Sequence, residues 1–184
     1  MNNWEKDLSI SSYRFENIVK PELKKILKGD LLLVEGESSD EMKSILDKLA
    51  GIDSWHINKL KGIRGIGSRI QTIKLSKFKN AKPFNTFTIR KKRDSGSITE
   101  FEKRKHAIKK DYLYPFYTIQ AYVSDIDDSL LSCAIAKTKD IFEYIEKYNP
   151  SKNHTGKEQK GQSEFIIVDW LDFKKAGYRI CIIN

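Results

Sequence analysis

The segment from Lys59 to Lys110 concentrates positive charge and yet has the pattern of a folded structure. It carries 17 Lys/Arg against 3 Asp/Glu, a net charge of +14, whereas the rest of the chain has a net charge of −5. Strand-like and Gly-rich stretches lie inside this segment, so it is not a plain basic tail. Its like charges repel one another in a compact fold unless an anion binds there. The charge pattern therefore favours a folded protein with a polyanionic partner.

Nucleic acid is the polyanion that this pattern favours, because each phosphate contact releases condensed counterions. DNA is expected as the partner more than RNA. The alternative is a solvated basic surface that keeps a small protein in solution. A zinc finger is excluded, since two Cys and three scattered His do not match its ligand spacing.

Length and composition predict one globular domain. The chain has 184 residues, of which 39% are hydrophobic and 32% charged, and no apolar run approaches the ~20 residues of a membrane span. The first residues, Met1 to Lys6, are not followed by the apolar stretch of a signal peptide, so a cytoplasmic location is expected. Cys133 and Cys181 lie in apolar strand-like runs, which predicts buried, reduced thiols.

Hydrophobic periodicity predicts helices and strands that together form one α+β (or α/β) domain, a mixed central sheet flanked by helices. A Gly-rich turn is predicted at Lys61–Gly67 and a mobile loop at 149–162. Predicted helices cover Tyr13–Lys28 (kinked at Pro21), the segment after Ser38, Ser97–Lys110, Thr138–Tyr148 and Trp170–Ala176. Predicted strands cover Leu31–Val34, Ile52–Asn58, Ile66–Leu75, Phe84–Arg90, Pro115–Val123, Leu130–Ala136, Glu164–Val168 and Tyr178–Ile183.

Two neighbouring predicted strands carry polar residues that could form a site. Gly51-Ile52-Asp53 begins one strand, and Arg69 and Gln71 lie two residues apart on the next, so they share a face. This arrangement resembles the active-site ribbon of the PD-(D/E)XK nuclease superfamily. In that family an Asp on one strand and an acidic-x-Lys triplet on the next hold Mg²⁺ and a water.

The resemblance covers roughly Tyr13 to Arg90 and implies a restriction-endonuclease-like fold, Mg²⁺ as cofactor and phosphodiester hydrolysis as activity. In this chain the triplet is Arg69-Ile70-Gln71, so its acidic member is missing and Gln71 stands where the family has lysine. The resemblance implies Asp53, Gln71 and Glu16 as catalytic residues, and Asp53 and Glu35 as metal ligands.

A second group of candidates follows the strand that ends at Arg90. The basic run there leads into a helix predicted to be capped by Ser97 and Glu100, and the N–H groups at a helix N-terminus favour a phosphate. Further along, this helix has a basic stripe. The residues expected to contact nucleic acid are Arg64, Arg69, Arg90, Arg93, Lys103 and Arg104.

Three functions remain open on the sequence. The first is a nucleic-acid-binding protein with a restriction-endonuclease-like fold that hydrolyses phosphodiesters with Mg²⁺. The second is a non-enzymatic DNA- or RNA-binding protein of a phage or mobile element. The third is a nucleotide-processing or ADP-ribosyl transferase enzyme that uses the basic region for phosphates.

Overall fold

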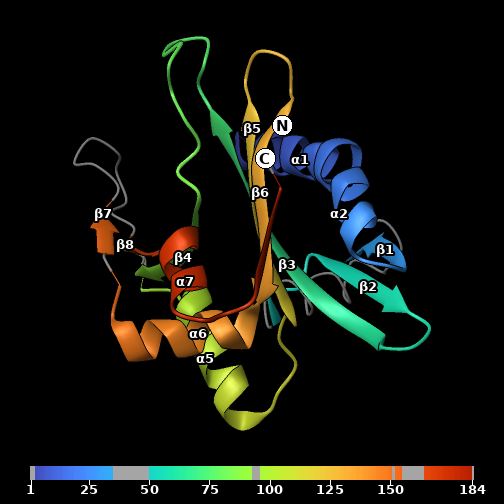
Figure 1. Cartoon of the computed structure of the whole chain (residues 1–184), viewed down its shortest axis with the longest axis vertical. Helices are drawn as coiled ribbons and strands as arrows, with labels where there is room; N and C mark the ends of the chain where they lie inside the picture. The colour runs from blue at the N-terminus through green and yellow to red at the C-terminus, as the bar shows by residue number, and fades with distance from the viewer. Residues whose placement is uncertain (1–2, 35–49, 93–95, 151, 155–163, 184) are drawn as a thin grey trace.

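The computed structural model describes residues 3–34, 50–92, 96–150, 152–154 and 164–183. The described residues form a single compact α+β domain with a six-stranded mixed sheet and a small three-stranded sheet, as Figure 1 shows. The helices are α1 (Asn3–Arg14), the π-helix η1 (Phe15–Val19), α2 (Lys20–Ile26), α5 (Glu100–Lys110), α6 (Thr138–Tyr148) and α7 (Trp170–Lys175). The strands are β1 (Asp30–Leu33), β2 (Ser54–Asn58), β3 (Gly62–Ile73), β4 (Thr86–Lys92), β5 (Tyr117–Ser124), β6 (Leu130–Lys137), β7 (Lys152–His154), β8 (Glu164–Asp169) and β9 (Ile180–Ile183).

The large sheet has the order β1-β2-β3-β5-β6-β9, and the small sheet the order β4-β8-β7. In the large sheet β3 and β5 are parallel, and the other neighbours are antiparallel. Short turns join β2 to β3 and β5 to β6, as antiparallel hairpins require. A parallel pair needs a longer crossover, which here contains β4 and α5.

Alternate residues of the central strands enter two apolar clusters on opposite faces of the large sheet. On one face, Phe15, Val19 and Leu23 of the N-terminal helices pack with Ile66 and Ile119. On the other face, α6, α7 and the small sheet pack in a cluster that includes Phe87, Tyr122, Trp170 and Phe173. Figure 1 shows the N-terminal helices apart from α5, α6 and the small sheet, with the large sheet between them. The mixed sheet flanked by helices is confirmed.

The N-terminal helical segment differs from the prediction. It begins at Asn3 rather than Tyr13, and it is interrupted by the five-residue π-helix η1 instead of being kinked at Pro21. Pro21 is accommodated in the first turn of α2, where its missing N–H costs least. The wider turn of η1 places Phe15 and Val19 together against the sheet, and both are buried.

The predicted Gly-rich turn at Lys61–Gly67 is wrong. The turn covers residues 59–61, where the Lys61 N–H donates to the Asn58 carbonyl at 3.2 Å, and β3 begins at Gly62. Inside the strand, a Cβ on Gly65 would lie 2.7 Å from Ile52 Cδ1, and a Cβ on Gly67 would overlap the Arg104 guanidinium. These two glycines permit close packing in a strand, and they do not form a turn.

The N-cap of α5 also differs from the prediction. Both Ser97-x-x-Glu100 and Thr99-x-x-Glu102 match the capping-box pattern, and the structure uses the second. Thr99 Oγ1 accepts from the Glu102 N–H at 3.3 Å, and Glu102 Oε2 accepts from the Thr99 N–H at 2.8 Å. Glu100 is thereby left for other contacts.

The remaining predicted elements are confirmed in kind, with shifts of a few residues at their ends. Part of the predicted loop at 149–162 forms the short strand β7, and the helix predicted after Ser38 lies outside the described residues.

Cys133 is buried, Cys181 is partly exposed, and neither forms a disulfide. Burial, followed by the nearby Cys181, raises the pKa of the Cys133 thiol to about 12, so it is not a thiolate at neutral pH. Within the described residues, no helix combines the length and apolar character of a membrane span.

Replacing Gly67 tests the close approach of β3 to α5. Gly67→Ala should lower the free energy of unfolding by about 3 kcal/mol, the upper end for overpacking. The new methyl group would overlap the Arg104 guanidinium, and the rigid Gly51 carbonyl oxygen would lie only 3.1 Å from it. Gly62→Ala is the control, since a Cβ there meets no atom within 4 Å and only the positive φ of 71° costs about 1 kcal/mol. Equal losses in urea denaturation of the two variants would contradict this packing.

Candidate functional site

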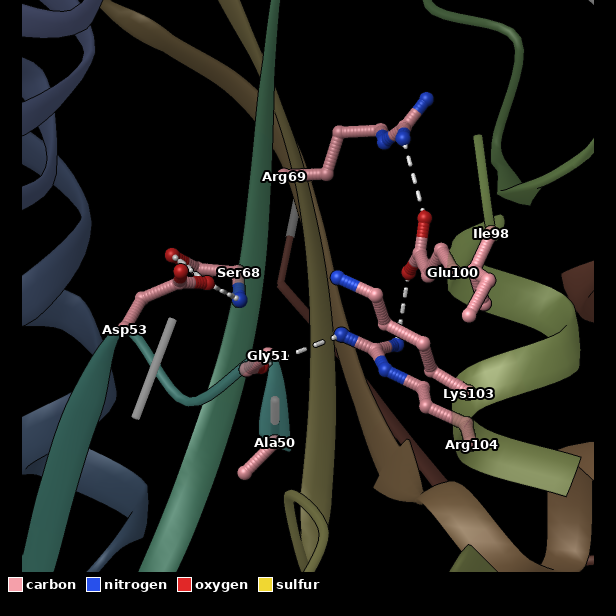
Figure 2. A pocket seen from close by; sticks show the side chains of 9 residues that line it. All are labelled: Ala50, Gly51, Asp53, Ser68, Arg69, Ile98, Glu100, Lys103 and Arg104. Atoms are coloured by element: carbon pink, nitrogen blue, oxygen red, sulfur yellow. Dashed lines mark hydrogen bonds and ion pairs between the residues drawn. The ribbon is translucent and has the colours of Figure 1, made fainter. Parts of the chain in front are cut away.

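A pocket of about 220 Å³ lies between the start of β2, the middle of β3 and the N-terminal half of α5. Figure 2 shows Arg69 of β3 and Glu100, Lys103 and Arg104 of α5 reaching toward one another, with Asp53 and Ser68 on the other side of the β3 ribbon. The pocket is rich in charged groups, as expected of a site for a polar ligand. Its lining residues are Ala50, Gly51, Asp53, Ser68, Arg69, Ile98, Glu100, Lys103 and Arg104.

The Glu100 carboxylate is the centre of the ionic contacts in this pocket. Its Oε2 lies 3.0 Å from Arg69 Nη2, and its Oε1 lies 2.7 Å from Arg104 Nη1. Figure 2 shows the carboxylate between these two guanidinium groups. Because Arg69 is on β3 and the other two residues are on α5, the ion pairs tie the helix to the sheet.

The pKa of Glu100 lies below its ordinary value of 4.5. Burial is the largest single effect and raises the pKa, but Arg104, Arg69, a backbone hydrogen bond from Arg90 and the charge of Arg90 together outweigh it. Three arginines therefore act on the carboxylate of Glu100.

Arg104 is the most deeply buried charged residue of the pocket, with 6% of its side chain exposed. Its Nη1 donates to Thr118 Oγ1 and its Nη2 donates to the Gly51 carbonyl, both at the long distance of 3.4 Å. Its Nε is buried and has no hydrogen-bond partner among the described residues. A buried N–H that lacks an acceptor is costly, so this group favours an anion or another acceptor in the pocket.

Asp53 also lines the pocket, where β3 holds it in place. Its Oδ2 accepts hydrogen bonds from the Ser68 N–H at 2.5 Å and the Ser68 hydroxyl at 3.2 Å. Because side chains alternate along a strand, Ser68 lies on the face opposite Arg69 and Gln71. The residue of β3 beside Asp53 is therefore a serine, not the predicted Arg69 or Gln71.

The other predicted catalytic residues lie away from the pocket. Gln71 Oε1 accepts from Gln120 Nε2 at 3.1 Å, in contact with β5. Glu16, on η1, forms an ion pair with Lys20 at 2.6 Å. The structure brings neither of them into the pocket lining with Asp53. Glu35 and Arg93 lie outside the described residues.

The side chains that the structure describes do not fit a Mg²⁺ site. No group of three potential ligands (His, Cys, Asp or Glu) gathers anywhere in that part of the chain. In the pocket, Asp53 is hydrogen-bonded to Ser68 and Glu100 is ion-paired with two arginines. A hard dication needs several oxygen ligands that are not already held by cations.

The remaining predicted basic residues lie in two places, around the pocket and near the start of β3. Arg90 and Arg69 both lie over the Phe165 ring, at 5.5 Å and 5.2 Å. Arg64 instead lies 4.2 Å from the centre of the Phe116 ring, near the start of β3. Arg69, Arg90, Lys103 and Arg104 are thus brought together by the fold, and Arg64 is placed apart.

Sequence reasoning missed the role of Glu100, which it used only as a helix cap. A signal was present, since Glu100 and Arg104 have the i, i+4 spacing of helical ion pairs. The contact with Arg69 has no local signal because it spans 31 positions of the chain.

Comparison with known proteins gives no relative. No protein-family model matches the chain, and no curated protein or solved structure is significantly similar to it.

Replacing Glu100 tests the ionic centre. Glu100→Gln should lower the free energy of unfolding by about 3 kcal/mol, because it leaves Arg69 and Arg104 without their carboxylate. Glu146→Gln is the matched control: its ion pair with Lys105 is exposed, and its loss should cost at most about 0.5 kcal/mol. Comparable losses in the two variants would contradict the central role of Glu100.

The pH dependence of stability gives a second test. Since the pKa of Glu100 is lower in the folded protein than its ordinary 4.5, the unfolded chain binds the proton first. The stabilisation is therefore complete above about pH 4.5 and is lost as the pH falls through the folded pKa. Urea midpoints measured between about pH 3 and pH 6 should fall less steeply in Glu100→Gln than in the wild type.

Proposed function

We propose that this protein binds nucleic acid, DNA in particular, with a backbone phosphate held in the pocket between β3 and α5. The observation that carries this proposal is the gathering of three arginines at one buried carboxylate. Arg69, Arg90 and Arg104 act on the single carboxylate of Glu100, and the buried Nε of Arg104 has no hydrogen-bond partner among the described residues. A phosphate would supply both the missing negative charge and the missing acceptor.

The dimensions of the pocket support a phosphate group rather than a whole base. Its volume of about 220 Å³ is below the several hundred Å³ typical of small-molecule sites. Lys103, which α5 also contributes to the pocket lining, adds a further positive charge. Phosphate contacts of this kind position a protein on nucleic acid without reading its sequence.

Binding without hydrolysis is the form of this function that the side chains favour. The order of elements, a leading helix, three antiparallel strands and a crossover helix before a parallel strand, supports the resemblance to PD-(D/E)XK nucleases. However, Ser68 occupies the position beside Asp53 where a second carboxylate would help to bind a metal. We therefore propose a restriction-endonuclease-like fold that binds nucleic acid and whose described side chains form no metal site.

The test is binding of a fluorescent duplex of about 20 base pairs, measured by anisotropy. Affinity should fall about tenfold or more between roughly 50 and 200 mM salt, because several phosphates are neutralised. A flat salt dependence would refute the phosphate contact. Mg²⁺-dependent products that disappear in Asp53→Ala would show instead a metal-dependent nuclease, and binding of mononucleotides without polymer would favour a nucleotide-processing enzyme.

Lys103→Ala should weaken duplex binding and reduce the slope of log K against log salt by about 0.9, the value for one lost phosphate contact. Lys24→Ala is the matched control, because Lys24 is exposed on α2, which packs on the opposite face of the sheet. Equal slopes in the two variants would place Lys103 away from the nucleic acid.

A further inference from the structure

The loop from Lys74 to Asn85, which connects β3 to β4, combines lysines with aromatic rings. It contains Lys74, Lys77, Lys79 and Lys82 and has no acidic residue. All four lysines are exposed. In Figure 1 the loop extends beyond the upper end of the sheet, away from the pocket of Figure 2.

Two phenylalanines of this loop lie in solvent. Phe78 is 66% exposed and Phe84 is 70% exposed. Burying a Phe side chain is worth about 1.5–3 kcal/mol, and these two rings do not obtain that stabilisation within the fold. The Phe84 ring contacts the buried Tyr122 ring edge to face, at a centroid distance of 6.2 Å, and most of the Phe84 side chain stays exposed.

The loop is held in a defined conformation by its own turns and by the β5–β6 hairpin. The Phe78 N–H donates to the Lys74 carbonyl at 3.0 Å, and the Ala81 N–H donates to the Phe78 carbonyl at 2.9 Å. Asp125, at the tip of the hairpin, accepts from both the N–H and the hydroxyl of Ser76. Phe78 therefore projects from an ordered turn, which lowers the entropy cost of using it in binding.

This combination has the chemistry of a surface for single-stranded nucleic acid. Lysines attract the phosphates, and an exposed ring can stack on a base whose face is not covered by a neighbour. In a duplex the base faces are already stacked on one another, so Phe78 and Phe84 would gain little there. An anionic membrane also attracts lysines and aromatic residues, but two rings on a turn bury far less apolar surface than the amphipathic helices that bind membranes.

We propose that the loop 74–85 binds single-stranded nucleic acid, with Phe78 and Phe84 stacked on bases and the lysines on the adjoining phosphates. This proposal rests on the proposed function, and it adds a second contact. Along β3 the loop begins six residues after Ser68 of the pocket, which is about 20 Å at about 3.3 Å per residue.

The experiment compares Phe78→Ala, Phe84→Ala and the double variant with the wild type. Affinity is measured for a thymidine oligonucleotide of about 15 nucleotides and for a duplex of equal length. Each single variant should bind the single strand at least about fivefold more weakly, the effect of losing one stacked base, with duplex affinity unchanged. Phe78→Trp should restore single-strand binding because it restores the ring.

Leu60→Ala is the matched control. Leu60 is 95% exposed at the β2–β3 turn, at the opposite end of β3, so its loss removes apolar surface without removing a stacking ring. Single-strand affinity should not change in this variant. If Leu60→Ala weakens binding as much as Phe78→Ala does, the effect is not stacking and the proposal is overturned.

The remaining outcomes separate this proposal from the proposed function. If the wild type binds nucleic acid but the double Phe variant binds the single strand equally well, the loop proposal fails and the proposed function stands. If the wild type binds neither oligonucleotide, both fail. If the double variant loses binding to phosphatidylserine vesicles while keeping single-strand binding, the loop is a membrane contact and the proposal is overturned.

Discussion

The parallel pairing of β3 with β5 is the constraint on which the rest of this structure depends. The two strands are in register from Ile66 opposite Tyr117 to Ile73 opposite Ser124. Parallel neighbours run in the same direction, so the chain that leaves β3 must return to the other end of the sheet before β5 begins. It leaves through the loop 74–85, adds β4 to the small sheet and returns through α5. One pairing thus sets both the loop at one end of β3 and α5 beside the pocket.

The same constraint explains the distribution of charge. Lys59 and Lys61 lie in the turn before β3, the pocket lies beside the middle of β3, and Lys74 begins the loop after it. At about 3.3 Å per residue, the twelve residues of β3 separate these ends by about 40 Å. A basic segment that is continuous in sequence is therefore extended in space, and a long polyanion matches this arrangement better than a compact one does.

Much of the fold could be predicted from the sequence because its signals are local. The β5–β6 hairpin and α6 follow from apolar periodicity, and both are confirmed within a residue or two. The turn at Lys61–Gly67 was mispredicted because glycine has the same local signature in a turn and in a strand that packs closely. Only the contact of Gly67 with Arg104, 37 positions later, distinguishes the two cases.

The site was predictable only in part, for the same physical reason. Asp53, Arg69, Lys103 and Arg104 do line one pocket. Their partners, Ser68 for Asp53 and Glu100 for the two arginines, depend on strand register and on where the crossover places α5. A shift of one residue between β2 and β3 would exchange Ser68 for Arg69 beside Asp53, and periodicity does not determine that register.

The π-helix η1 has a consequence for how this chain tolerates changes in length. A π-turn accommodates one residue more than a regular helical turn, and with it Phe15 and Val19 of η1 and Leu23 of α2 all face the sheet. Deleting one residue between Phe15 and Val19 would convert the turn to α-helix without rotating Leu23 away from the sheet. The same deletion within α6 would turn every later side chain of that helix by about 100°. The N-terminal helices therefore contain a place where a natural variant can lose a residue and keep its core.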